Sequence, residues 1–446
     1  MHLRITSGRV LQGLLRGLTE DARAAAAARD AQATIDLCQA LLSERGEVSG
    51  ARLAEEVLVS YRSLSDQGAE AFFDLLIEAF APDRRRLLDA AEQYRQSPTQ
   101  TNFLGLQRAV ESHRQELFRR CNLAPGGTAM LVDLRRRLLR TLRAHPERAV
   151  IDADLVHLFR SWFNRGFLIL QRIDWHTSAV TLERIIKYES VHQIQGWVDL
   201  RRRLEADRRC YAFFHPALPD EPLIFIEVAL SRGMIGSVQP LLDATAPVTD
   251  PARADCAVFY SITNCQEGLR GVSFGNFLIK QVVEDLGREF PKLRTFATLS
   301  PIPGFQAWLS SAGRERVSPA LAGLLDSSDL RGSLEGLAET SPLKKELLRL
   351  CAYYLLKAKR DAVPIDSVAR FHLANGASLE RLNWMGDTSD SGIHRSLGLM
   401  VNYHYRRQHV ERNHEAYAKH HQIIASRELQ RQSKRNGGIR HRLRMK

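Results

Sequence analysis

Two motifs in the second half of the chain carry side chains that could do chemistry. Ser300 precedes Pro301 in a Leu-Ser-Pro-Ile-Pro-Gly-Phe turn, and His372 lies between Phe371 and Leu373. Proline restricts the residue before it to extended backbone, so the Ser300 hydroxyl is held on a stiff turn. A histidine can polarise such a hydroxyl or relay its proton. Each residue alone also fits a structural role, the serine in a turn and the histidine in a core.

A glycine-rich segment precedes this serine. It reads Gln266-Glu267-Gly268-Leu269-Arg270-Gly271-Val272-Ser273-Phe274-Gly275 and leads into an apolar helical run. The N–H groups and the dipole at a helix start can hold a pyrophosphate. The spacing fits neither a Walker loop nor a dinucleotide fingerprint. It resembles the CoA loop of Gcn5-related acetyltransferases, with Arg270, Ser273 and Gly275 at its key places, Ser273 replacing a usual glycine or alanine. A tight strand-to-helix turn is the alternative.

Short β-rich runs between turn residues predict strands on both sides of this loop. Strands are predicted over residues 211–214, 223–230, 257–262 and 295–300. A helix from about Gly275 to Phe290 joins the last two into a β-α-β unit. A second helix is predicted over residues 343–359, and an irregular segment over residues 371–405. The second half is therefore predicted to be an α/β domain.

The first half has a different texture, with apolar residues every three or four positions among strong helix formers. The apolar stripes are Leu11, Leu14, Leu15 and Leu18; Phe72, Phe73, Leu76 and Phe80; and Leu131, Leu134, Leu138 and Leu142. Glycines and prolines divide this part into separate helices. The sequence predicts an α+β protein, with an all-helical bundle over residues 1–158 and the α/β domain over residues 159–446.

Composition limits the partners and cofactors. The formal net charge of +12 favours polyanionic partners, among them a small phosphorylated ligand. No nucleic-acid motif is present, and no run of about 18 apolar residues predicts a membrane span. The six cysteines are scattered, which favours a reducing compartment over a disulfide framework. No metal site is expected, because His404, His409 and His414 recur every five residues and point in different directions around a helix, and His420 and His421 add no metal motif.

As a set, these segments resemble one family, the malonyl-CoA decarboxylases. The resemblance rests on residues 211–230, 261–286, 296–308 and 371–405, in the order and with the separations of the family. It implies a helical domain used in oligomerisation, giving a dimer or a tetramer, followed by a catalytic domain of the Gcn5-related N-acetyltransferase type. It also implies conversion of malonyl-CoA to acetyl-CoA and carbon dioxide, with no cofactor.

The resemblance assigns roles to individual residues. Ser300 looks like the catalytic serine and His372 like its partner. The residues expected to bind substrate are Ser261, Tyr405, Arg270, Gly271, Ser273 and Gly275. The chain ends in Arg-Met-Lys instead of the peroxisomal Ser-Lys-Leu of some relatives, which argues against a peroxisomal address. A cytoplasmic location is expected.

Two other functions remain open at this point. An acyltransferase that moves an acetyl group from acetyl-CoA to an amine needs the same loop and, in addition, a cleft for its acceptor. A scaffold that binds RNA or DNA is favoured only by the positive charge, and its signature would be steeply salt-dependent binding of polynucleotides.

Overall fold

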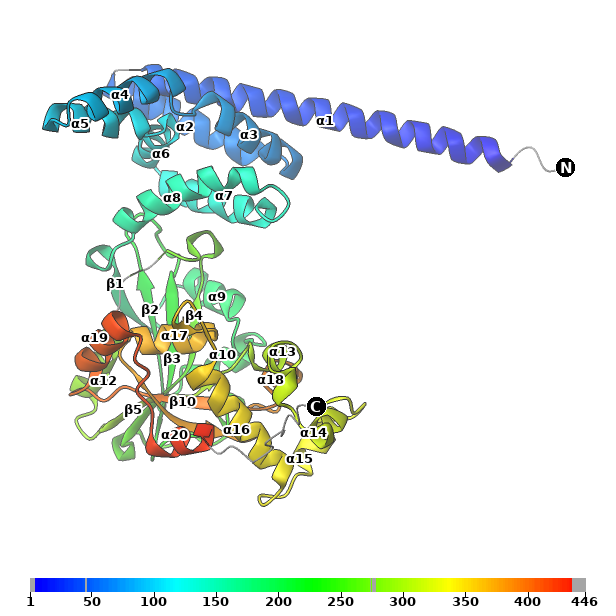
Figure 1. The fold of residues 1–446 in the computed structure, drawn as a ribbon, viewed down its shortest axis with the longest axis vertical. Coiled ribbons are helices and arrows are strands. Elements are labelled where there is room, and N and C mark those ends of the chain that lie inside the picture. The colour runs from blue at the N-terminus through cyan, green and yellow to red at the C-terminus, as the bar shows by residue number, and fades with distance from the viewer. Residues whose placement is uncertain (1–4, 45, 273, 275–277, 435–446) are drawn as a thin grey trace, which may run out of the picture. The chain divides into compact units, whose positions relative to one another are not determined.

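A computed structural model of the chain describes residues 5–44, 46–272, 274 and 278–434, with side chains from residue 20 onward. These residues form two compact units (Figure 1). The helical unit contains Met1–Leu168, His215–Pro219 and Gln266–Phe274, and the sheet unit contains the rest of the chain. The boundary predicted at residue 158 falls inside helix α8 (Ala149–Trp162) and stays a prediction.

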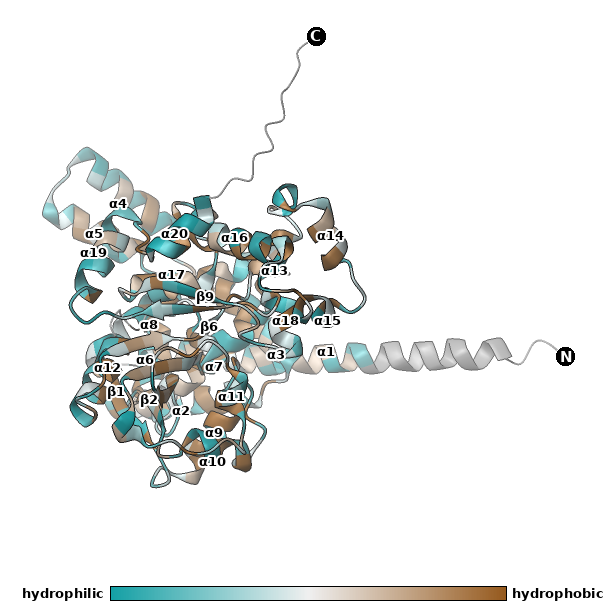
Figure 2. Cartoon of the chain, turned by 90° about the horizontal axis from the view of Figure 1, so that it is seen from below, coloured by the Kyte–Doolittle hydropathy of each residue, from teal (hydrophilic) through white to brown (hydrophobic). Residues whose placement is uncertain are grey.

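In the first segment of the helical unit, the described residues form helices joined by short turns. Its helices are α1 (Ile5–Ser43), α2 (Glu47–Ser63), α3 (Asp66–Ala79), α4 (Arg84–Gln96), α5 (Gln100–Val110), α6 (His113–Leu123), α7 (Gly127–Thr141) and α8, with 3₁₀ turns η1 (Pro146–Arg148) and η2 (Arg165–Phe167). Side chains accept hydrogen bonds from free N–H groups at three helix starts, Ser65 for α3, Asp83 for α4 and Thr99 for α5. The amphipathic helices alternate teal and brown in Figure 2.

The predicted apolar stripes of α3 and α7 are buried, except that Leu142, just after α7, is only half-buried. Phe72, Phe73 and Leu76 of α3 are buried, as are Leu131, Leu134 and Leu138 of α7. The stripe of Leu11, Leu14, Leu15 and Leu18 lies on α1, outside the residues whose side chains are described. None of the described helices is both long and apolar enough to cross a bilayer.

The sheet unit combines strands with shorter helices. Its strands are β1 (Ile169–Ile173), β2 (Arg208–Phe214), β3 (Ile224–Ser231), β4 (Cys256–Asn264), β5 (Thr295–Thr298), β6 (Ser300–Pro301), β7 (Lys359–Arg360), β8 (Val363–Pro364), β9 (Ser378–Asn383) and β10 (Met400–His404). Its helices are α9 (Ala179–Tyr188), α10 (Trp197–Arg203), α11 (Gln239–Leu242), α12 (Leu278–Glu289), α13 (Phe305–Leu309), α14 (Pro319–Leu325), α15 (Leu330–Glu335), α16 (Pro342–Lys357), α17 (Ser367–Ala374), α18 (Asp390–Ser396), α19 (Val410–His420) and α20 (Arg427–Lys434), with 3₁₀ turns η3 (Pro251–Arg253) and η5 (Arg314–Arg316).

Among the described residues, eight strands form one sheet in the order β1-β2-β3-β4-β5-β10-β6, with β9 also paired to β10. β4 and β5 run parallel, as the predicted β-α-β unit requires, whereas the other neighbouring pairs are antiparallel. The parallel pairing ends at Phe259 and Thr298. The predicted fold class is confirmed as α+β: a helical N-terminal region precedes a sheet domain that contains the parallel pair of β4 and β5.

The prediction of an irregular segment over residues 371–405 is wrong. It contains the end of α17, strands β9 and β10, and helix α18. Asparagines concealed these strands, because asparagine is depleted in sheets. Asn402 of β10 is fully buried, and its amide donates to the carbonyl oxygens of Ile235 and Thr298, while Asn383 of β9 donates to its oxygen. Those partners are distant in sequence, so the local pattern does not reveal them.

Candidate active site

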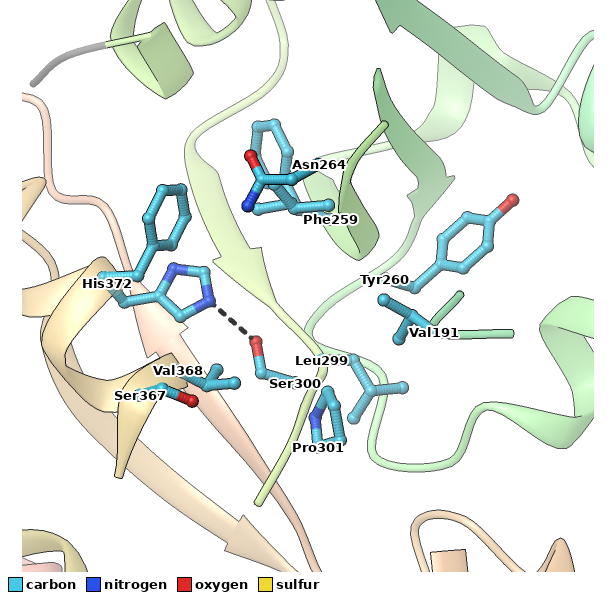
Figure 3. Close-up of a pocket in the computed structure, with 12 residues that line it drawn as sticks. Val191, Phe259, Tyr260, Asn264, Leu299, Ser300, Pro301, Ser367, Val368 and His372 are labelled. Carbon is cyan, nitrogen blue, oxygen red and sulfur yellow. Dashed lines mark hydrogen bonds between the residues drawn. The ribbon is translucent and has the colours of Figure 1, made fainter. Parts of the chain in front are cut away.

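A cavity of about 230 Å³ opens in the sheet unit where β4 and β5 separate (Figure 3). Its lining residues come from both sides of the gap and from α17: Val191, Phe259, Tyr260, Ile262, Asn264, Leu299, Ser300, Pro301, Ser367, Val368, Phe371 and His372. Most of these side chains are apolar. The cavity therefore surrounds a few polar groups with a low-dielectric wall.

Ser300 belongs to a continuous chain of hydrogen bonds. Its Oγ atom lies 3.1 Å from Nε2 of His372 and donates to Oγ1 of Thr298 at 2.8 Å. On the other side of the imidazole, Nδ1 lies 2.8 Å from the hydroxyl oxygen of Tyr405. Figure 3 shows the imidazole and the Ser300 hydroxyl pointing toward each other. The structure thus brings three of the predicted site residues together, Ser300, His372 and Tyr405.

Short elements hold these side chains in place. Ser300 is fixed by its pairing with Val401 in the ladder of β6 and β10. His372 lies on α17, whose start is capped by Asp366 through the N–H of Ala369 at 2.8 Å. The imidazole stacks on the ring of Tyr403, with the centroids 4.4 Å apart. This packing and the two hydrogen bonds leave the imidazole little rotational freedom.

Burial keeps the imidazole neutral. His372 is 3% exposed, and desolvation lowers its pKa to about 3. A neutral imidazole carries one N–H. Because Ser300 gives its single hydroxyl hydrogen to Thr298, the bond between Ser300 and His372 requires the hydrogen on Nε2. Nδ1 then accepts from Tyr405, whose pKa burial raises well above its usual value. All donors in the chain therefore point in one direction, from Tyr405 toward Ser300 and Thr298.

The lowered pKa of His372 predicts a pH dependence of stability. The unfolded histidine titrates near 6.5, so between about pH 6.5 and 3 the unfolded chain binds the additional proton. The contribution of His372 is complete above pH 6.5 and decreases as the pH falls, by up to about 1.4 kcal/mol per pH unit. We expect the difference in unfolding free energy between the wild type and His372→Gln to shrink from pH 7 to pH 5 in urea titrations.

Other buried groups also make stability depend on pH, such as Glu227, whose pKa desolvation raises to about 8. Their effects are the same in the wild type and in His372→Gln, so they cancel in the difference between the two unfolding free energies. A difference that stays constant across this range would contradict the buried, neutral imidazole.

The structure places Ser261 apart from this chain of bonds. Ser261 is buried on β4, but its hydroxyl donates to Oε2 of Glu189 at 2.7 Å, and Ser261 is not among the described residues that line the cavity. The other carboxylate oxygen of Glu189 accepts from the N–H groups of Val191 and His192, at 2.7 Å each. Since Val191 lines the cavity, Ser261 contributes to the wall indirectly through Glu189.

The glycine loop is described only in part. Arg270 and Gly271 are exposed, and Gly271 has a φ of +79°, in the left-handed region that glycine adopts readily. Ser273 and Gly275, the other predicted loop residues, lie outside the described residues. The predicted helix after the loop is present as α12, whose buried face includes Leu278, Val282 and Leu286. The assignment of the loop to CoA stays a prediction.

Sequence reasoning missed Thr298, Tyr403 and Glu189. The strand pattern offered a signal for Thr298, because residues two apart on an extended chain share a face, and Thr298 lies two positions before Ser300. Tyr403 lies likewise two positions before Tyr405. Glu189 follows the end of α9, and nothing in its local sequence indicates its contact with β4. In the described part of the chain, no group of three or more His, Cys, Asp or Glu side chains is arranged to hold a metal ion.

Comparisons with known proteins agree over both parts of the chain. Residues 166–442 match the family model of the malonyl-CoA decarboxylase C-terminal domain, and residues 80–163 match that of the N-terminal domain. The mitochondrial malonyl-CoA decarboxylase of Anser anser anser is 34% identical over 423 residues, covering 86% of this chain and 84% of the relative. The Mus musculus protein of the same name is 34% identical over 418 residues, covering 87% and 81%.

Two solved structures are also similar. The malonyl-CoA decarboxylase of Rhodopseudomonas palustris is 48% identical with a TM-score of 0.85, and the match covers 90% of this chain and 99% of that chain. The malonyl-CoA decarboxylase of Agrobacterium vitis is 46% identical with a TM-score of 0.82, with the same coverage.

Proposed function

Because the chain belongs to the malonyl-CoA decarboxylase family, we propose that it converts malonyl-CoA to acetyl-CoA and carbon dioxide in the cavity beside Ser300. The observation that carries this proposal is the chain of hydrogen bonds from Tyr405 through His372 to Ser300, which ends at the cavity wall. These groups supply donors and a proton without an ionised side chain among them.

Decarboxylation of malonyl-CoA requires hydrogen-bond donors and one proton. When the bond between the malonyl carboxylate carbon and the α-carbon breaks, carbon dioxide leaves and the electron pair forms a thioester enolate. Hydrogen-bond donors stabilise the charge on the thioester oxygen, and one proton must then reach the α-carbon. In this proposal Ser300 contacts the malonyl group and passes a proton from water to the α-carbon, while the N–H at Nε2 of His372 donates to the Ser300 oxygen and stays on the imidazole. Tyr405 orients the imidazole through Nδ1.

The remaining assignments rest on the sequence. Ser261 is proposed to help orient the malonyl carboxylate indirectly, through Glu189 and the cavity residue Val191 that Glu189 holds. Arg270, Gly271, Ser273 and Gly275 are proposed to hold the CoA pyrophosphate, in a reaction that uses no metal or prosthetic group and takes place in the cytoplasm.

A dimer or tetramer formed through the helical unit is also proposed. It is supported by the apolar side chains that α4 and α5 expose: Leu88, Phe103, Leu104 and Val110. If these side chains lay in the interface between subunits, assembly would remove them from water.

An assay without an acceptor tests the reaction. The purified protein is incubated with malonyl-CoA alone, and acetyl-CoA and carbon dioxide are measured over time. A decarboxylase forms both in equal amounts, whereas an acyltransferase would require an amine and would leave malonyl-CoA unchanged. If no carbon dioxide appears, the proposed function is wrong.

Removing the Tyr405 hydroxyl should slow the reaction moderately. Tyr405→Phe keeps the ring and its packing but deletes the donor to Nδ1 of His372, so the imidazole loses its preferred orientation and tautomer. We expect kcat to fall by about tenfold, since one such bond contributes roughly 1–1.5 kcal/mol, with KM nearly unchanged. Tyr353→Phe, which removes a hydroxyl from a ring stacked on Trp308, is the matched control. Equal kcat values for Tyr405→Phe and the wild type would remove Tyr405 from the mechanism.

A further inference from the structure

A buried arginine of α7 holds the main chain of the glycine loop. Arg135 is 3% exposed, and its Nη1 atom donates to the carbonyl oxygens of Gly268 at 2.8 Å and of Arg270 at 2.9 Å. Its Nε atom donates to Oδ1 of Asp152 on α8 at 2.7 Å. All of these residues belong to the helical unit. One guanidinium therefore joins two helices to two carbonyl groups of the loop.

The loop also packs against α7 without intervening side chains. A Cβ atom built on Gly268 would lie 2.0 Å from the carbonyl oxygen of Val132, so only glycine permits this approach. Leu269 and Val272 on the same segment are buried. The first half of the loop is thus fixed to the helical unit by hydrogen bonds and by packing.

This anchoring determines which way one peptide group faces. In a trans peptide the C=O and the following N–H point in opposite directions. The Arg270 carbonyl points toward Arg135, so the N–H of Gly271 points away from α7. Gly271 is exposed, and a Cβ atom built on it would meet nothing within 4 Å. An outward N–H on an exposed loop before a helix can meet an anion.

We propose that Arg135 is a positioning residue for coenzyme A. It never touches the ligand, but it holds the peptide between Arg270 and Gly271 in the orientation that presents its N–H to the pyrophosphate. The inference rests on the proposed function of the loop. Because the segment from Gly268 to Gly271 is already fixed, CoA binds without the cost of ordering this segment. Loss of Arg135 therefore weakens binding of the nucleotide part of the substrate and leaves the chemistry at Ser300 intact.

The test compares two thioesters in Arg135→Ala and Arg135→Lys. Lysine keeps the charge but lacks the planar fork that bonds Asp152 and two carbonyls together. We expect KM for malonyl-CoA to rise at least about tenfold, the scale of one charge-assisted hydrogen bond, with kcat within about twofold of the wild type. The malonyl thioester of pantetheine has no phosphates, so its kcat/KM should not change. The lysine variant decides the question if the alanine variant does not fold.

Arg140→Ala is the matched control. Arg140 lies on the same helix and is exposed, and it contacts the loop only through the side chain of Glu267, at 3.2 Å. Its KM for malonyl-CoA should stay within about twofold of the wild-type value. A wild-type KM in the Arg135 variants overturns the proposal, and so does an equal loss with both thioesters, which indicates a general structural role. A wild type that decarboxylates neither thioester would instead overturn the proposed function.

Discussion

Ser300→Ala is expected to lower kcat for malonyl-CoA by about 10²- to 10⁴-fold, the usual contribution of a positioned proton donor. Alanine keeps the backbone of β6 and its pairing with β10, but the hydroxyl between His372 and the cavity is lost. KM should change little, because most of the substrate is bound elsewhere. Release of carbon dioxide and formation of acetyl-CoA give kcat directly.

Ser311→Ala is the matched control, since Ser311 is exposed and its hydroxyl donates to the carbonyl oxygens of Ala307 and Trp308 in the preceding helix α13. The control should keep wild-type kcat. If Ser300→Ala turns over as fast as the control, Ser300 has no part in the reaction.

His372→Ala is expected to lower kcat by a similar factor, about 10²-fold or more. The imidazole bonds to both Ser300 and Tyr405, so its removal breaks the chain of donors at its centre. If serine and histidine act as one unit, the two losses do not add. The double variant Ser300→Ala with His372→Ala should therefore be about as slow as the slower single variant.

The control for this pair is His176→Ala, whose side chain is almost fully exposed. Melting temperatures of all variants separate loss of activity from loss of fold, because His372→Ala also leaves a space beside Tyr403. A double variant slower than either single variant by the product of their effects would show that the two residues act independently.

Local sequence was sufficient for much of the sheet. The predicted strands over residues 223–230 and 257–262 correspond to β3 and β4 within two residues at each end, and the helix predicted over 343–359 corresponds to α16. The two strands are buried on both faces and are therefore continuous apolar runs with turn residues beside them, a pattern that predicts strands. The signal failed in β10, where the buried Asn402 depends on partners far away in the sequence.

Only part of the candidate site could be predicted from the sequence. Ser300, His372 and Tyr405 were selected through the family resemblance. Their side chains meet in the structure, although 72 positions separate Ser300 from His372 and 33 separate His372 from Tyr405. Neither Thr298 nor Glu189 was found, because each acts through a contact across the fold. The hydrogen bonds from Arg135 to the glycine loop span 133 and 135 positions and leave no local trace.

The helical unit is not a single continuous stretch of the chain. The chain enters the helical unit three times, the second time at His215–Pro219 and the third at Gln266–Phe274. Cutting away the first 168 residues would leave Leu269 and Val272 without the helices that cover them. A shortened chain would keep Ser300 and His372, but the segment from Gly268 to Val272 would lose the hydrogen bonds of Arg135 that hold it. The helical unit therefore cannot be removed by one cut in the chain, because two of its segments come later in the sequence.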